Sequence, residues 1–182
     1  MKDFSEHILD LTQNSIRAKA TLIEISITES KVSNLYWIGI SDNGTGMDDE
    51  TIKLVTDPYY TSRSTRKVGL GVPLFKHNAE LTGGSFQLSS VLGKGTQISA
   101  DFINNHLDRL PVGDLVGTYL LLIAANPTLN FLITHTTDSG TYIFDTREVK
   151  NLLGEIPIND PSVRQFLKEM IQENLEAIGT ER

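Results

Sequence analysis

A strand-like segment that runs into a glycine-rich turn constrains the fold of this chain most. Tyr36, Ile38 and Ile40 recur at every second position, and the sequence Asp42-Asn43-Gly44-Thr45-Gly46 follows at once. This pattern predicts a strand over residues 35 to 42 that sets a carboxylate at the edge of a sheet. The glycines allow the backbone to approach a flat ligand closely. Alone, however, Asp-Asn-Gly is also an ordinary turn sequence, so the motif needs support from other segments.

A helix predicted over residues 4 to 18 carries Asp10, Asn14 and Arg17 at spacing i, i+4, i+7, which places them on one stripe. The opposite side is mainly apolar and can pack on a sheet. An amide oxygen suits Mg²⁺, a carboxylate can orient or deprotonate a water, and a guanidinium can face phosphate. The alternative is that these side chains only form a solvated polar face.

Two further glycine-rich segments follow the first turn. Gly69-Leu70-Gly71 opens a helix predicted over residues 70 to 82, whose free N–H groups and positive end can face phosphate. Gly93-Lys94-Gly95-Thr96 precedes a strand predicted to end at residue 103. Together with the Asp42 turn, these segments indicate an ATP pocket. The Asp42 carboxylate can accept from the exocyclic amino group of adenine, which guanine lacks at the same position.

Several segments, in this order, resemble the GHKL superfamily of gyrase, heat-shock chaperone, histidine kinase and MutL proteins. Residues 10–21 resemble its asparagine box and are closest in wording to MutL, whereas residues 57–63 resemble the aromatic box of bacterial histidine kinases. Residues 69–102 resemble a kinase ATP-binding domain almost continuously. The resemblance covers about residues 4–103 and implies an α+β fold, a two-layer α/β sandwich of the Bergerat type, with helices on one sheet face.

The resemblance also implies a role for each matching residue. Asn14 corresponds to the asparagine that chelates Mg²⁺, and Asp42 to the aspartate that reads adenine. The other matches are the glycines beneath the base, those beneath the phosphates, and a threonine that supports adenine: Gly44 and Gly46, Gly69 and Gly71, and Thr96.

Departures from the family pattern leave the reaction open. Hydrolytic members carry Glu four residues before the metal-binding asparagine, where this chain has the shorter Asp10. Histidine kinases have Lys or Arg three residues after that asparagine, as Arg17 is here. Asp10 and Arg17 are therefore the predicted catalytic residues. Together they do not decide between phosphoryl transfer and ATP hydrolysis. In the loop between about residues 56 and 68, Lys67 replaces a family glycine; Lys67 and Arg63 are predicted to neutralise phosphate, with an ordinary charged loop as the alternative.

Composition limits the partners of the chain. Its 182 residues carry a net charge of -7, which argues against a nucleic-acid surface, and the absence of cysteine excludes disulfides and thiolate metal sites. No signal sequence follows Met1, and the longest apolar run, residues 115–125, is too short to span a bilayer. We therefore expect a cytoplasmic protein without nucleic-acid or membrane partners. The four histidines are dispersed and are read as incidental.

Residues 1–103 are thus predicted to form the ATP-binding domain, and residues 104–182 an α/β extension that packs on it and whose role the sequence does not indicate. In this extension we expect a helix over 113–125, strands over 130–136 and 140–145, a short helix capped by Thr146, and a longer one from Asp160. The longer helix carries an apolar stripe that includes Phe166. This stripe is expected to pack in the core, with a partner-binding face as the alternative.

The residues and the resemblance together predict a protein that binds ATP and Mg²⁺ and transfers the γ-phosphoryl group to a separate, unidentified partner protein. Charge neutralisation by Asn14 through Mg²⁺ and by Arg17 would then supply most of the catalysis. Two alternatives remain open: a nucleotide-controlled binding module without catalysis, and a slow ATPase that uses Asp10 as base.

Overall fold

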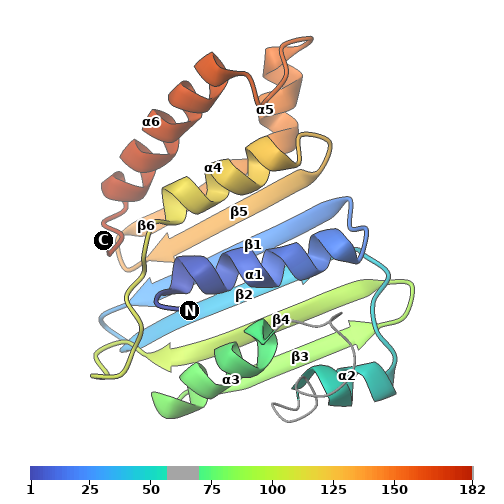
Figure 1. Ribbon diagram of the computed structural model, residues 1–182. Helices are drawn as coiled ribbons and strands as arrows, with labels where there is room; N and C mark the ends of the chain where they lie inside the picture. Colours follow the sequence, from blue (N-terminus) through green and yellow to red (C-terminus); the bar gives the residue numbers. More distant parts are fainter. Residues whose placement is uncertain (57–69, 182) are drawn as a thin grey trace.

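A computed structural model describes residues 1–56 and 70–181 of the chain (Figure 1). In these residues, one sheet of six strands runs in the order β3-β4-β2-β1-β5-β6. The strands are β1 (Leu22–Ser30), β2 (Leu35–Asp42), β3 (Phe86–Val91), β4 (Gly95–Ile103), β5 (Asn130–Thr137) and β6 (Gly140–Asp145). The helices are α1 (Phe4–Arg17), α2 (Asp49–Thr56), α3 (Gly71–Leu81), α4 (Leu115–Ala125), α5 (Thr146–Leu153) and α6 (Pro161–Ala177).

Alternating apolar residues give the sheet one buried face. Ile23, Ile25 and Ile27 of β1 are buried on the same side as Tyr36 and Ile38 of β2, as their spacing predicts. Helices α1, α3 and α4 lie over this face (Figure 1). The result is a sheet layer covered by a helix layer, which confirms the predicted α+β two-layer sandwich.

Aromatic packing fixes α1 and α3 on the sheet. The ring of Phe4 in α1 stacks on Tyr36 of β2, with ring centroids 4.9 Å apart, and lies 4.6 Å from the ring of Phe102 in β4. Phe75 of α3 reaches the same Phe102 ring at 5.6 Å. Buried aromatic pairs of this kind combine a large apolar area with a preferred geometry. They therefore hold the two helices that border the predicted nucleotide pocket.

The extension after residue 103 continues the same sheet. Strand β5 pairs with β1 in parallel, from Leu22 opposite Asn130 to Thr28 opposite Thr136, and β6 then pairs with β5 in antiparallel fashion. Helix α4 contacts both α1 and α6. The boundary between residues 103 and 104 remains a prediction, but the two segments share one sheet and one hydrophobic core.

Two local predictions for the extension are wrong. Helix α5 is capped by Asp145, whose Oδ1 accepts from the backbone N–H of Arg147 at 2.8 Å, and not by Thr146. The Thr146 side chain is instead buried and accepts from the backbone N–H of Phe131 at 2.8 Å. In α6 the stripe through Val163 and its i+4 neighbours is buried, but Phe166 at its flank is 64% exposed.

No helix within the described ranges is both long and apolar enough to cross a membrane.

Candidate nucleotide-binding site

Helix α1 presents the predicted polar stripe beside the sheet. Its buried side includes Ile8 and Leu11, which pack in the core, so Asp10, Asn14 and Arg17 are held on the opposite side. The guanidinium of Arg17 donates to the amide oxygen of Asn14 at 3.1 Å. The two side chains proposed to meet the metal and the phosphates are therefore already in contact with each other.

The carboxylate of Asp10 lies against the start of α3. Its Oδ2 atom is buried and has no hydrogen-bond partner among the described residues. A Cβ atom added to Gly71 would lie only 1.8 Å from this oxygen, so any larger residue at Gly71 would displace the carboxylate. A buried carboxylate oxygen without a partner is costly unless a ligand supplies a hydrogen-bond donor to it.

Two donors fix the carboxylate of Asp42 at the end of β2. Ser15 of α1 donates from its hydroxyl to Oδ2 at 2.6 Å, and the backbone N–H of Gly44 donates to Oδ1 at 2.8 Å. Ser15 was not among the residues that the sequence predicted for the site. One signal in the sequence could have indicated this role: Ser15 follows Asn14 directly and therefore lies at the same end of α1 as the predicted metal ligand.

The turn after Asp42 is packed tightly against the β3–β4 hairpin. Gly46 has φ 64°, and a Cβ atom there would lie 2.0 Å from the carbonyl oxygen of Val91, so only glycine fits. The hydroxyl of Ser90 accepts from the backbone N–H of Met47 at 2.8 Å and lies 2.9 Å from the hydroxyl of Thr96. Ser90, which the sequence did not single out as a site residue, thus joins the turn to Thr96.

A cavity of about 160 Å³ lies among these elements. Five predicted site residues line it: Asn14, Arg17, Asp42, Gly46 and Thr96. Apolar side chains form most of its remaining wall, among them Ile40, Met47, Val55, Val72 and Ile98. An apolar slot with a few convergent polar groups suits a flat heterocyclic base.

The remaining predicted residues fall into two groups. Asp10, Gly44 and Gly71 do not line the cavity but contact residues beside it: Gly44 donates to Asp42, and Gly71 lies against Asp10 and precedes the lining residue Val72. Arg63, Lys67 and Gly69 lie outside the described residues.

The oxygen donors of α1 fit a magnesium ion. Mg²⁺ is held by few protein oxygens and keeps waters and substrate phosphates as its other ligands. Within the described residues, no group of three or more His, Cys, Asp or Glu side chains could hold a metal alone. The amide oxygen of Asn14 therefore suits a nucleotide-borne Mg²⁺ better than a protein-only metal site.

Comparison with known proteins establishes the class of this domain. Residues 2–105 match the family described as histidine kinase-, DNA gyrase B-, and HSP90-like ATPase. The chain belongs to this family. ATP binding is the property that membership in it implies.

Individual relatives agree with this assignment. A putative sensor protein of Shewanella frigidimarina is 36% identical over 97 residues, which are 52% of this chain and 15% of that protein. The sensor histidine kinase YvrG of Bacillus subtilis is 30% identical over 103 residues, 54% of this chain and 18% of the kinase. The chain thus matches less than a fifth of the length of either protein.

Solved structures extend the likeness in fold beyond residue 105. The ATPase domain of Aquifex aeolicus MutL, complexed with ADP, has a TM-score of 0.52 and 14% identity, and the match covers 100% of this chain and 99% of that one. At this identity the likeness concerns the fold alone. It agrees with the α+β fold that the resemblance in the sequence implies.

Proposed function

We propose that this chain binds ATP with Mg²⁺ and transfers the γ-phosphoryl group to a separate partner protein. The observation that carries this proposal is the unpartnered carboxylate oxygen of Asp10, buried against Gly71 on the stripe that also holds Asn14 and Arg17. When the carboxylate turns away from Gly71 toward the nucleotide, this oxygen can accept a hydrogen bond from an incoming hydroxyl or imidazole group.

Each site residue has a distinct task in the proposal. Asp42, oriented by Ser15, accepts from the amino group of adenine. Asn14 holds Mg²⁺, which neutralises phosphate charge, and Arg17 moves from the Asn14 amide to the phosphates when nucleotide enters. Arg63, Lys67 and Gly69 are assigned to the phosphates from the sequence alone.

Transfer is favoured over hydrolysis by the length of the acid and by the named relatives. Asp10 is one methylene shorter than the Glu of hydrolytic family members, which makes it a poorer base for a small attacking water. A relative matched over half of this chain is named a sensor histidine kinase. A slow ATPase that uses Asp10 remains the hydrolytic alternative.

A nucleotide-controlled binding module is the second candidate. Helix α1 carries the polar stripe and also contacts α4 of the extension, and β1 is joined directly to β5. A change in α1 when nucleotide binds therefore has a short physical route to residues 104–182. In this candidate the site binds ATP without hydrolysing it or transferring its γ-phosphoryl group.

Incubation of the purified chain with γ-labelled ATP, alone and with cell extract, distinguishes these functions. Label on a protein other than the chain supports transfer, and free phosphate from the chain alone supports hydrolysis. Binding of ATP with neither labelled partner nor free phosphate supports the nucleotide-controlled binding module. Asp42→Asn is the matched control, because label that persists unchanged in a variant without nucleotide affinity comes from a contaminant.

A further inference from the structure

An apolar groove lies between α5 and α6, with a volume of about 320 Å³. Helix α5 packs on β5, and α6 packs on α4 and β6, so each helix is held in place by other elements. A connection over residues 154–160 joins the two helices at one end of the groove (Figure 1). The packing of α5 and α6 therefore leaves a space between them that their own side chains do not fill.

Each wall of the groove is an apolar stripe at helical spacing. On α5 the stripe has spacing i, i+3, i+4, and on α6 it has spacing i, i+3, i+4, i+7: Val149, Leu152 and Leu153, and Val163, Phe166, Leu167 and Met170. Val163 and Leu167 are 8% and 1% exposed, whereas Leu152 and Phe166 are 89% and 64% exposed. Single apolar side chains on a surface are ordinary, but two of this size on the lips of one groove indicate a surface that another molecule covers.

Acidic side chains flank both stripes. Glu148 of α5 precedes Leu152 by one turn, and on α6 Glu169 and Glu173 follow Phe166 at i+3 and i+7. The three glutamates are exposed, and none of them forms an ion pair with any residue that the structure describes. Their charge is therefore open to a partner.

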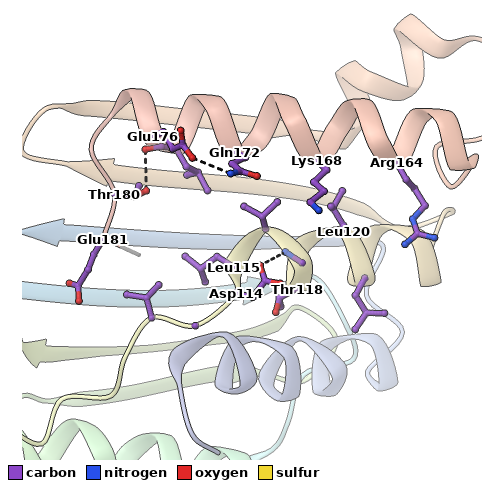
Figure 2. Close-up of a pocket in the computed structure, with 16 residues that line it drawn as sticks. Asp114, Leu115, Thr118, Leu120, Arg164, Lys168, Gln172, Glu176, Thr180 and Glu181 are labelled. Atoms are coloured by element: carbon purple, nitrogen blue, oxygen red, sulfur yellow. Dashed lines mark hydrogen bonds between the residues drawn. The ribbon is translucent and has the colours of Figure 1, made fainter.

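The four cations of α5 and α6 are turned to other contacts. Arg147 pairs with the Asp145 cap of its own helix at 2.6 Å, and Lys150 donates to the side chain of Asn130 at 3.0 Å. Arg164 and Lys168 lie on the other side of α6 and point toward α4 (Figure 2). The uncompensated charge beside the groove is thus of one sign.

This acidic rim restricts what can cover the groove. In a symmetric dimer each surface patch meets its own copy, so two acidic rims would come together in a chain of net charge -7. An anionic membrane surface and a nucleic acid are repelled for the same reason. The arrangement of charge favours a positively charged protein segment.

We propose that this groove binds a basic amphipathic α-helix of a partner protein. Its apolar side chains would cover Leu152 and Phe166, and its lysines or arginines would face the three flanking glutamates. A helix suits the site because both walls are helix ridges, between which the ridge of a third helix can pack. Residues 163–170 extend over about 11 Å at 1.5 Å per residue, which is the length of two helical turns. The inference does not rest on phosphotransfer, because this groove and the nucleotide cavity share no lining residue.

Two labelled peptides test the charge preference of the groove in the full chain without nucleotide. The first is an amphipathic helix with leucines at i, i+3, i+4 and i+7 flanked by lysines, and the second has glutamate at every lysine position. Fluorescence anisotropy should show that the lysine peptide binds about tenfold more tightly.

Charge reversal separates binding in the groove from general attraction to an acidic chain. Glu169→Lys/Glu173→Lys should weaken the lysine peptide about tenfold, because both flanking charges on α6 are inverted. The matched control is Glu80→Lys/Asp108→Lys, which makes the same change in net charge at exposed sites elsewhere. This control should change the affinity by less than about twofold, since screening weakens charges beyond about 10 Å.

A second pair of variants tests the apolar stripe without changing charge. Leu152→Ala should weaken the lysine peptide about fivefold, since it removes apolar area that a bound helix would cover. Leu107→Ala makes the same change at a leucine that is 97% exposed outside the groove, and should leave the affinity unchanged. Alanine keeps α5 helical, so thermal unfolding of Leu152→Ala should match that of the parent.

Four outcomes would overturn the proposal. They are no binding of the lysine peptide, equal affinity for both peptides, control variants that weaken binding as much as the groove variants do, and a dimer in analytical ultracentrifugation that Leu152→Ala dissociates.

Discussion

The carboxylate of Asp42 is the single group on which recognition of the base depends. Its two oxygens accept from Ser15 and Gly44, which leaves it oriented toward the cavity with little freedom to turn. We expect Asp42→Asn to weaken ADP and ATP equally, by about 1–3 kcal/mol, because a charge-assisted acceptor is lost. Ser15→Ala should cost less, about 0.5–1.5 kcal/mol, because only the orienting donor is removed. Isothermal calorimetry on folded variants measures both, and an unchanged affinity for Asp42→Asn would remove the basis for this pocket.

Asp10 decides which reaction the site can perform. If its short side chain stays too far from a water on the γ-phosphorus, release of free phosphate by the parent is very slow and Asp10→Glu accelerates it. Asp10→Ala should abolish partner phosphorylation with nearly unchanged ATP affinity, since the acid acts on the acceptor. Phosphate release and partner labelling in the three proteins test this. Equal release rates, with no labelled partner in any, would mean that Asp10 has no catalytic role.

At the scale of elements, His7 links α1 to α3 and makes their contact sensitive to pH. Its Nε2 lies 2.9 Å from the amide nitrogen of Asn78, and burial, followed by the nearby N-terminal charge, lowers its pKa from 6.5 to about 4. The folded state therefore favours the neutral ring. Its contribution is complete above the unfolded pKa and is lost as the pH falls toward 4.

Chemical denaturation should accordingly show a loss of about 2 kcal/mol in the free energy of unfolding between pH 8 and pH 5 that depends on His7. His7→Gln cannot titrate and should be less dependent on pH by that amount, even if it is less stable overall. His77→Gln, on the outer side of α3, is the matched control. Parallel pH profiles for the parent and His7→Gln would contradict the assignment.

Local periodicity predicted α1 and β2, because the residues that pack on one stripe of a helix or one face of a strand recur at fixed spacing in the sequence. Periodicity did not predict features that depend on contacts between residues far apart in the sequence. Asp145 and Thr146 are both good capping residues, and only the bond from Phe131 to Thr146, made across the fold, selects Asp145 as the cap. The role of Ser15 was missed for the same reason, since its partner Asp42 is 27 residues away.

For the whole molecule, the parallel pairing of β1 with β5 could not be read from local patterns. Both strands alternate in burial, and nothing in either indicates which edge it joins. The pairing makes β1 a central strand and brings α4 against α1. The ATP-binding segment and the extension are therefore expected to stabilise one another.

This arrangement predicts that the whole chain unfolds in one transition. Trp37, the chain's only tryptophan, lies in β2, whereas circular dichroism reports on all helices, including those of the extension. We expect both signals to change at the same denaturant concentration, and ADP at about 100 times its Kd to add about 2.7 kcal/mol to both. A fragment of residues 1–103 should aggregate or lack a cooperative transition, because β1 would expose an unpaired edge. Two separate transitions, or a stable fragment with the nucleotide affinity of the full chain, would show that the segments fold independently.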